Sequence, residues 1–486
     1  MKREDLLSKI SDPSKVWDVV VIGGGATGLG VAVDAVTRGY SVALFEWEDF
    51  AKATSSRSTK LVHGGVRYLA QGDVSLVLEA LYERGLLQQN APHLVKNQSF
   101  LIPNYRYWDN FLYTVGLTIY DILAGRLSLG RSKYVSKKKT TSYLPTVRVD
   151  GLKGGVVYHD GQFDDSRLAV NLAQSCVENG GCPINRMKVT AMLHGSDGRA
   201  RGVKVQDLMN GQEYEVKAKA VINATGIFVD SIMEMDVPTH EHMVKPSQGV
   251  HLVLDKSFLQ SDYAIMIPKT DDGRVLFAVP WHDKVVVGTT DTLREHPELE
   301  PQALESEIEF ILNTAGRYLT RKPQRSDVLS VFAGLRPLAA PKKEGKSTKE
   351  ISRSHKIFVS ENKLITITGG KWTTYRRMAE DTVDKAIELN LLEKKACVTK
   401  KFRIHGYQLN PDLNNYGSDI QAIKTLMQSD PAMAEKLHPK YDYTVAEVVW
   451  AVREEMALNV EDILARRVRL LFLDARVAAE VAPKVA

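Results

Sequence analysis

The chain has 486 residues, 44% of them hydrophobic and 25% charged, which is ordinary for a globular protein of two or three domains and excludes a disordered or low-complexity chain. Its net charge of +5 permits an anionic substrate or membrane surface, whereas the absence of a Lys/Arg-rich arm or a nucleic-acid-binding motif predicts no nucleic acid partner. The few cysteines lack metal-ligand or disulfide spacing, and no stretch reaches the roughly 20 apolar residues of a spanning helix, so we expect neither a metal site nor a transmembrane segment.

The first informative stretch is a short strand that runs into a glycine-rich turn. Residues 18–22, of which the last four are apolar and β-branched, predict a buried strand. Gly23, Gly25 and Gly28 follow in the spacing G-x-G-x-x-G, and residues 26–37 predict the helix whose first N–H groups face a pyrophosphate. We therefore predict that these three glycines contact a dinucleotide cofactor.

An acidic residue ends the second strand of this unit. Residues 41–45 predict that strand, and Glu46 follows it at the separation from the glycines that suits hydrogen bonding to a ribose. Residues 53–69 are rich in hydroxyl groups, small residues and cations. On the residues alone, an ordinary polar loop and a phosphate-binding loop fit this segment equally well. Its hydroxyl-bearing candidates for phosphate binding are Ser55, Ser56, Ser58 and Thr59.

Aromatic and apolar residues concentrate between residues 105 and 123, with cations around them. The apolar core, residues 111–123, is too short to span a bilayer and includes Asp121. Two interpretations stay open: a helix that lies in an anionic membrane interface, and an ordinary buried helix beside a solvated basic loop. The neighbouring cations are Arg106, Arg126, Arg131, Lys133, Lys137, Lys138 and Lys139.

The middle of the chain predicts a capped helix and then a strand. Asp164 or Asp165 is expected to cap a helix over residues 166–178, with Arg167 as an ion-pair partner. Residues 218–226 predict an apolar strand that ends in an Ala-Thr-Gly turn. We interpret the two aspartates as structural rather than catalytic.

Short alternating strands between residues 245 and 290 predict an antiparallel sheet inserted into an α/β domain. A later strand, residues 328–338, places Arg336 near its end. The last strand, residues 363–368, runs into a Gly-Gly-Lys turn just before a helix, which suits close approach to a flat ring.

After about residue 400 the composition becomes helical and charged. Thr444 and Glu447 form a capping-box pattern, and Asn459 is expected to cap the next helix. Apolar residues follow at helical spacing, which predicts a packed core rather than a cofactor site.

Three stretches together resemble the FAD-dependent glycerol-3-phosphate dehydrogenases: the glycine-rich turn, residues 55–69 (SSRSTKLVHGGVRYL) and residues 369–376 (GGKWTTYR). The resemblance runs from about residue 16 to about residue 395, and more loosely to the end. It implies an α/β fold with an FAD-binding Rossmann-like domain of the glutathione-reductase/D-amino-acid-oxidase type, an inserted antiparallel-sheet substrate domain and a C-terminal α-helical domain. The expected boundaries are 16–105, 150–240 and 340–395 for the FAD-binding domain, 240–340 with an excursion at 105–150 for the substrate domain, and 396–486 for the helical domain.

The resemblance also implies oxidation of sn-glycerol 3-phosphate to dihydroxyacetone phosphate, with FAD as the hydride acceptor. Three kinds of site residue follow from it. The candidates for holding or deprotonating the C2 hydroxyl are Lys371, His63 and His251, with Arg336 as a further catalytic candidate. The candidates for binding the substrate phosphate are Arg67, Tyr68, Arg336 and Arg353. The cofactor contacts are expected to be Gly23, Gly25, Gly28, Glu46, Ser55, Ser56, Lys60, Gly226 and Gly370.

The family further implies peripheral attachment to a respiratory membrane and a quinone as electron acceptor. We therefore expect a cytoplasmic protein on the inner face of the cell membrane, with a homodimer as one compatible assembly. The alternatives are an oxygen-reducing oxidase of the same substrate, an amine or amino-acid oxidase on a similar scaffold, and a catalytically silent flavin- or membrane-binding module.

Overall fold

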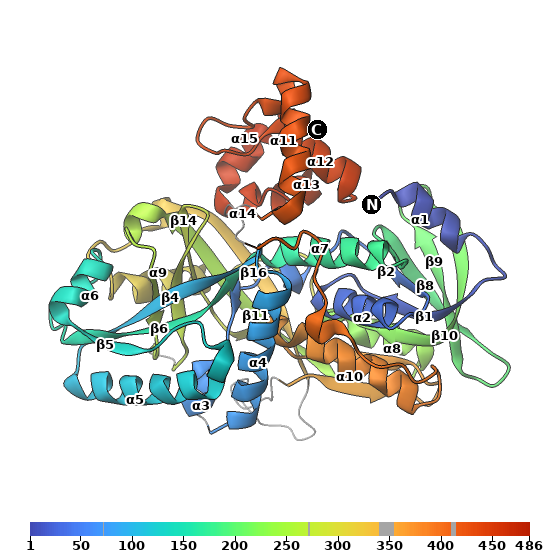
Figure 1. Ribbon diagram of the computed structural model, residues 1–486, viewed down its shortest axis with the longest axis horizontal. Coiled ribbons are helices and arrows are strands. Elements are labelled where there is room, and N and C mark those ends of the chain that lie inside the picture. Colours follow the sequence, from blue (N-terminus) through green and yellow to red (C-terminus); the bar gives the residue numbers. More distant parts are fainter. Residues whose placement is uncertain (71, 271–272, 340–353, 410–414) are drawn as a thin grey trace.

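The computed structural model describes residues 1–70, 72–270, 273–339, 354–409 and 415–486. Two β-sheets lie side by side, and helices from the C-terminal part of the chain sit above the junction between them (Figure 1). The first helix, α1 (Arg3–Ile10), lies at the outer end of the first sheet, beside β7.

The first sheet is built around a parallel core in the order β7–β2–β1–β10–β18. Parallel strands covered on both faces are continuous apolar runs, and the second half of β1 has this character, with its last four residues buried. β17 pairs antiparallel with β18, and β8, β9 and β10 form an antiparallel meander. The strands are β1 (Val16–Ile22), β2 (Val42–Phe45), β7 (Cys182–Ile184), β8 (Met187–His194), β9 (Ala200–Asp207), β10 (Glu213–Asn223), β17 (Lys356–Val359) and β18 (Ile365–Thr368).

Helices cover this sheet, and two of the predicted ones begin within one residue of the expected start. Helix α2 (Ala26–Thr37) has the predicted bounds and contacts both α7 (Asp165–Glu178) and α10 (Tyr375–Glu388). The side chain of Asp164 caps α7 by accepting from the Arg167 N–H at 2.9 Å, which confirms the structural interpretation. The expected ion pair of Arg167 with the two aspartates is wrong, because its guanidinium instead binds Glu455 of the C-terminal region. Helix α8 (Val229–Asp236) follows β10.

The second sheet runs in the order β15–β11–β14–β13–β12–β4–β6–β3, with β16 along β11 and β5 along β6. Neighbouring strands within this sheet run antiparallel, except for β12 and β4, which run parallel. Strands β4 and β6 belong to this sheet although the expected boundaries place them in the FAD-binding segments, because β4 pairs with the edge that β12 would otherwise leave open and β6 pairs with β4. The strands are β3 (Leu61–Val62), β4 (Val95–Asn104), β5 (Lys133–Ser136), β6 (Gly154–Phe163), β11 (Val244–Asp255), β12 (Ala264–Ile267), β13 (Leu276–Trp281), β14 (Lys284–Gly288), β15 (Thr292–Leu293) and β16 (Val328–Ala339).

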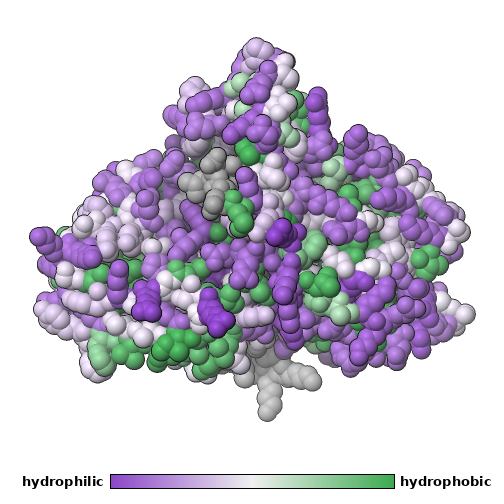
Figure 2. Space-filling model, in the orientation of Figure 1, coloured by the Kyte–Doolittle hydropathy of each residue, from purple (hydrophilic) through white to green (hydrophobic). Residues whose placement is uncertain are grey.

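The helices around the second sheet include an exposed apolar one. Helix α5 (Tyr107–Ala124) buries only a few residues, while Trp108 and Ile122 are 68% and 71% exposed. Figure 2 shows the resulting hydrophobic patch at the lower left, where Figure 1 places α5. Within the described ranges, no helix combines the length and apolar character needed to cross a bilayer. The other helices here are α3 (Val66–Ala70), α4 (Val74–Asn90), α6 (Lys137–Tyr143) and α9 (Glu305–Gly316).

The C-terminal helices form a small core of their own. Both predicted caps are confirmed: Thr444 forms a capping box with Glu447 before α12, and the Asn459 side chain accepts from the Asp462 N–H before α13. The helices are α11 (Ile420–Ser429), α12 (Val445–Glu454), α13 (Val460–Arg466), α14 (Leu470–Leu473) and α15 (Ala475–Val485). Their buried apolar residues include Ile463, Leu464, Val468, Val477 and Val481.

Candidate active site

A cavity of about 640 Å³ lies where the two sheets meet. On one side it is lined by residues at the carboxyl ends of the parallel strands, among them Ile22 at the end of β1, Glu46 after β2 and Ala224 after β10. On the other side it is lined by residues of the second sheet, such as His251 and Phe277. Ligands of open α/β sheets bind at this edge, so the topology itself indicates the site.

The glycine-rich turn forms one end of this cavity. Gly23 and Gly25 line it, together with Ala26 at the first turn of α2. Gly28 lies behind them: a Cβ at this position would be 1.9 Å from the carbonyl oxygen of Gly23, so the helix can approach the strand only without a side chain here. The bare backbone and the helix N-terminus form a cradle that fits a pyrophosphate.

Glu46 closes the cradle on the side of β2. Its carboxylate accepts from the backbone N–H of Gly24 at 2.6 Å and of Glu48 at 2.8 Å. Burial raises the pKa of this carboxyl to about 7, although both N–H groups oppose the shift. A ribose whose hydroxyl groups donate to this carboxylate favours its ionised form, which fits the predicted role.

The hydroxyl-rich loop after Glu46 divides into two faces. Ser55, Ser58 and Thr59 line the cavity, and Ser55 Oγ accepts from the Ala26 N–H at 2.9 Å. The Ser56 side chain is fully buried and does not line the cavity. Of the two serines predicted to contact the cofactor, Ser55 faces the cavity and Ser56 faces the protein interior.

Lys60, another predicted cofactor contact, does not line the cavity. Its ammonium is buried, pairs with Asp165 at 2.7 Å and donates to the Ser56 carbonyl at 2.6 Å. Burial lowers the pKa of this lysine to about 8 despite the carboxylate beside it. Lys60 is thus an internal anchor of the loop, and the prediction that it contacts the cofactor directly is not what the structure shows.

The same side of the cavity contains the two remaining predicted glycines. Gly226 ends the Ala-Thr-Gly turn after β10, and Gly370 follows β18; both line the cavity and both have positive φ values, 62° and 74°. A Cβ at Gly370 would meet Met378 Sδ at 2.4 Å, so this turn requires glycine. The structure therefore brings both glycines to the same cavity as the glycine-rich turn.

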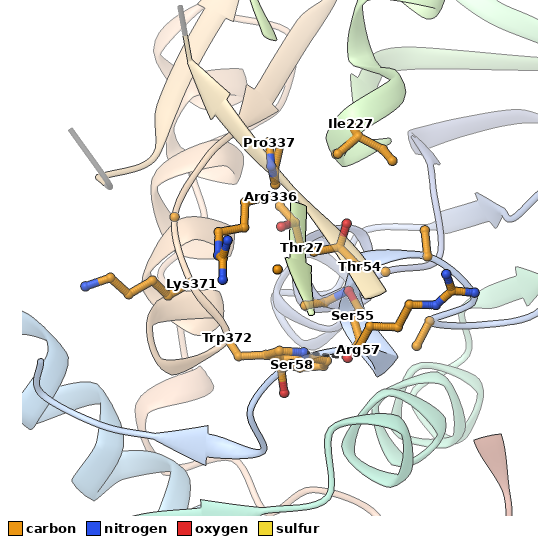
Figure 3. A pocket seen from close by; sticks show the side chains of 18 of the residues that line it. Thr27, Thr54, Ser55, Arg57, Ser58, Ile227, Arg336, Pro337, Lys371 and Trp372 are labelled. Carbon is orange, nitrogen blue, oxygen red and sulfur yellow. Dashed lines mark hydrogen bonds between the residues drawn. The ribbon is translucent and has the colours of Figure 1, made fainter. Parts of the chain in front are cut away.

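Arg336 occupies the middle of the cavity wall. Its guanidinium donates to Thr289 Oγ1 at 3.1 Å and pairs with Asp291 at 3.4 Å. In Figure 3 its side chain points toward Trp372 across the cavity, whereas the side chain of Lys371 extends away from it. The Lys371 ammonium lies 4.0 Å from the centre of the Tyr68 ring. Both residues line the cavity, but their cations point in different directions.

His251 and His63 are the imidazoles in the lining. His251 is buried, its Nε2 is 2.9 Å from the hydroxyl of Thr59, and its Nδ1 has no hydrogen-bond partner among the described residues. Burial lowers the pKa of His251 well below its usual value, and the charges of Lys60 and Arg336 lower it further. His251 is therefore neutral at physiological pH.

The backbone of His63 is fixed by Thr373, which lies just before α10 and whose hydroxyl accepts from the His63 N–H at 3.2 Å. The side chain of Arg67 and all of Arg353 lie outside the part of the chain that the structure describes, so these two phosphate-binding candidates stay predictions.

Three lining residues were missed by the sequence analysis. Trp372 donates from Nε1 to the Ser55 carbonyl at 2.8 Å, and Arg57 pairs with Glu300 at 2.6 Å. Both belong to the two stretches that carry the family resemblance, which was the available signal. Arg274 lines the cavity from a hairpin without any recognisable motif.

Comparison with known proteins agrees with this geometry. Residues 18–376 match the family described as FAD dependent oxidoreductase, and residues 362–486 match the C-terminal domain of alpha-glycerophosphate oxidase. A probable mitochondrial glycerol-3-phosphate dehydrogenase of Caenorhabditis elegans is 39% identical over 518 residues, covering 99% of this chain and 71% of the relative. The mitochondrial enzyme of Schizosaccharomyces pombe is 40% identical over 547 residues, covering 98% and 84%.

Among solved structures, glycerol-3-phosphate dehydrogenase from Bacillus halodurans complexed with FAD has a TM-score of 0.78 at 30% identity, covering 99% of this chain and 90% of that one. The fold and the cavity thus define an FAD-dependent oxidoreductase, with FAD as its cofactor. Five of the predicted cofactor contacts line this cavity: Gly23, Gly25, Glu46, Gly226 and Gly370. More narrowly, the chain belongs to the family of FAD-dependent glycerol-3-phosphate dehydrogenases.

Proposed function

We propose that the protein oxidises sn-glycerol 3-phosphate to dihydroxyacetone phosphate. The observation that carries the proposal is the continuity of one cavity: the dinucleotide cradle at Gly23 and Glu46 opens directly onto a polar wall with Arg336 and His251. The names of the relatives support the same substrate. A cavity that joins a flavin site to a cation and a neutral imidazole suits a small phosphorylated alcohol.

The reaction removes two hydrogens, one from C2 and one from the hydroxyl group on C2. The hydroxyl proton passes to a base on the protein, the C–H bond breaks with its electron pair, and C2 becomes a carbonyl carbon. When bound, FAD accepts the hydride; the protein binds and orients the substrate and takes the proton.

Arg336 is the proposed phosphate ligand. Thr289 and Asp291 hold its guanidinium from one side, which sets the direction of the group before a substrate arrives. A guanidinium binds phosphate oxygens in a bidentate manner, and pre-orientation lowers the entropy lost on binding. Arg67 and Arg353 remain additional phosphate-binding candidates.

His251 is the proposed base for the C2 hydroxyl. It is neutral because burial and two nearby cations lower its pKa. The tautomer that donates Nε2–H to Thr59 keeps a lone pair on Nδ1, which is buried and has no hydrogen-bond partner among the described residues. Lys371 stays a candidate for holding the C2 oxygen, and His63 stays an alternative base.

The experiment that tests this function compares substrates on the FAD-loaded protein under anaerobic conditions. sn-Glycerol 3-phosphate is expected to bleach the flavin absorbance, whereas glycerol, which lacks the phosphate, is expected to do so only at far higher concentration. Bleaching by amines or amino acids, but not by glycerol 3-phosphate, would replace the proposal with the amino-acid oxidase alternative.

We also propose that the electrons pass to a quinone in an anionic membrane, on the inner face of the cell membrane. The exposed apolar face of α5 supports this, since aromatic and aliphatic side chains there meet solvent instead of protein. The neighbouring cations Arg106, Arg126 and Lys133 are exposed as well. Apolar side chains with basic neighbours are typical of a helix that lies in an anionic interface.

Sedimentation with vesicles tests the attachment. The wild type is expected to bind vesicles that contain phosphatidylglycerol and to bind phosphatidylcholine vesicles more weakly, with the difference reduced by salt. The double variant W108S/F111S is expected to bind at least about tenfold more weakly, because each large apolar side chain contributes about 1.5–3 kcal/mol when buried. L208S/M209S, which alters exposed apolar residues at the end of β9, is the matched control. Equal binding by all three proteins would contradict this role of α5.

Oxygen is the competing acceptor. If the protein is an oxidase, glycerol 3-phosphate in air yields one hydrogen peroxide for each substrate oxidised. A quinone-reducing dehydrogenase is expected to form little peroxide and to turn over rapidly with a soluble quinone analogue.

A further inference from the structure

The C-terminal helices place a buried arginine against the back of the cavity wall. Arg469 precedes α14 and has a φ of 65°, a left-handed conformation that non-glycine residues rarely adopt. Its guanidinium donates to a carboxylate oxygen of Asp165 and to the carbonyl of Ser56, at 3.0 Å in both cases. It also donates to the hydroxyl of Ser166. A guanidinium with several fixed acceptors holds those acceptors in one geometry.

Asp165 and Lys60 extend this contact along the cofactor loop. The second oxygen of Asp165 accepts from Lys60 Nζ at 2.7 Å and from the backbone N–H and hydroxyl of Ser58 at 3.1 Å and 2.7 Å. The Ser56 carbonyl accepts from both Lys60 and Arg469. Residues 56–60 are therefore fixed from the side that faces the protein interior.

Thr59 lies in the same loop but lines the cavity. Its hydroxyl is the hydrogen-bond partner of His251 Nε2, at 2.9 Å. The His251 ring stacks on Phe332 with a centroid distance of 4.9 Å, and Phe332 contacts Phe472 of α14, also at 4.9 Å. The C-terminal helices thus reach His251 by a polar route through the loop and by an aromatic route through Phe332.

The docking of these helices does not depend on Arg469 alone. Arg466 and Arg467 both pair with the buried Asp49, at 2.6 Å and 2.9 Å. Ser330 of β16 donates to the Leu471 carbonyl at 2.9 Å. Because several other contacts attach the C-terminal helices, Arg469 can be altered without detaching them. Its hydrogen bonds to Asp165 and to the Ser56 carbonyl therefore indicate a function besides docking.

We propose that Arg469 is a positioning residue for the oxidation step, an inference that rests on the proposed function. Through Asp165 it fixes residues 56–60, and the fixed loop holds the Thr59 hydroxyl against His251. That contact sets the orientation and tautomer in which the imidazole takes the C2 hydroxyl proton. The C-terminal helical region then acts on the active site, although none of its described residues lines the cavity.

A double-mutant cycle tests the relay, with the rate of flavin bleaching at saturating glycerol 3-phosphate as the readout. Thr59→Val removes the hydroxyl at one end, and Arg469→Met removes the guanidinium at the other. Each is expected to slow bleaching by roughly 10- to 100-fold, less than the roughly 100- to 10,000-fold effect of losing the acid–base group itself. Since both changes break the same relay, the double variant is expected to be no slower than the slower single variant.

The controls separate positioning from general stability. Arg476→Met changes an exposed arginine of α15 and is expected to leave the rate unchanged. Thr59→Ser keeps a hydroxyl and is expected to recover most of the rate. Hydrogen–deuterium exchange of a peptide that covers residues 56–60 gives a readout independent of turnover: it is expected to rise in Arg469→Met and to stay at the wild-type level in Arg476→Met.

A wild-type rate in Thr59→Val overturns the inference, even if Arg469→Met fails to fold. Multiplying losses in the double variant, or unchanged exchange of the loop in Arg469→Met, also overturn it. A wild-type protein that glycerol 3-phosphate cannot bleach refutes the proposed function instead, so the two failures are distinguishable.

Discussion

Replacing Glu46 by glutamine is predicted to remove most of the pH dependence of FAD binding. Burial raises the pKa of this carboxyl to about 7 in the folded protein, so it is largely protonated below that pH. A bound ribose that donates hydrogen bonds favours the ionised form and brings the pKa back toward its ordinary value. FAD affinity should therefore be greatest above pH 7 and fall as the pH decreases.

The size of the effect follows from this pKa. Between about pH 8 and about pH 5.5, protonation of a group with a pKa near 7 weakens binding by about 30-fold, or about 2 kcal/mol. In Glu46→Gln the affinity should be weaker at pH 8 by roughly 5- to 30-fold, because a hydrogen bond to a charged acceptor becomes a neutral one. The variant should then show little further change with pH.

The assay is titration of the FAD-free protein with FAD, followed by quenching of flavin fluorescence at constant ionic strength. Two results would refute the reasoning. One is a wild-type affinity that does not change between the two pH values. The other is a Glu46→Gln variant that keeps the wild-type pH dependence.

Three other changes have defined outcomes. Arg336→Met should raise the KM for glycerol 3-phosphate by roughly 10- to 150-fold through loss of charged hydrogen bonds while FAD stays bound, and steady-state kinetics would contradict this if KM were unchanged. Gly28→Ala should abolish tight FAD binding, because its Cβ would lie 1.9 Å from the Gly23 carbonyl oxygen; an absorbance spectrum with full flavin content would disprove it. Asp49→Asn should lower the free energy of unfolding by about 3–5 kcal/mol, since it leaves Arg466 and Arg467 without their shared buried carboxylate, and urea unfolding measures the loss.

The first half of the cofactor site was predictable because its chemistry is local. The glycine spacing, helix α2 and Glu46 lie within about thirty residues of one another, and each has a physical task that only a few residue types perform. The caps at Asp164 and Asn459 were predictable for the same reason, since a capping side chain bonds to the backbone three residues later.

The buried ion pairs could not be predicted in this way. Lys60 pairs with Asp165, 105 residues away, and Arg469 contacts the same carboxylate from 304 residues away. Nothing in the local pattern distinguishes such a lysine from one that binds phosphate. Arg167 was paired with the wrong carboxylates for the same reason: its true partner, Glu455, becomes a neighbour only after the C-terminal helices dock.

The orientation of these side chains could not be predicted from the sequence either. Lys371 was expected to share the substrate with Arg336, and both do line the cavity, but the two side chains diverge from the wall. The membrane interpretation of residues 105–123 was left open because an apolar helix face is the same in sequence whether protein or lipid covers it. The exposed Trp108 and Ile122 are visible only in the folded chain.

The most direct test of the central claim is an anaerobic titration of the purified, FAD-loaded protein with sn-glycerol 3-phosphate, in which absorbance and product are followed together. The account predicts that the flavin absorbance falls in proportion to the substrate added and that one dihydroxyacetone phosphate appears for each FAD reduced. A flavin that stays fully oxidised in excess substrate would contradict it.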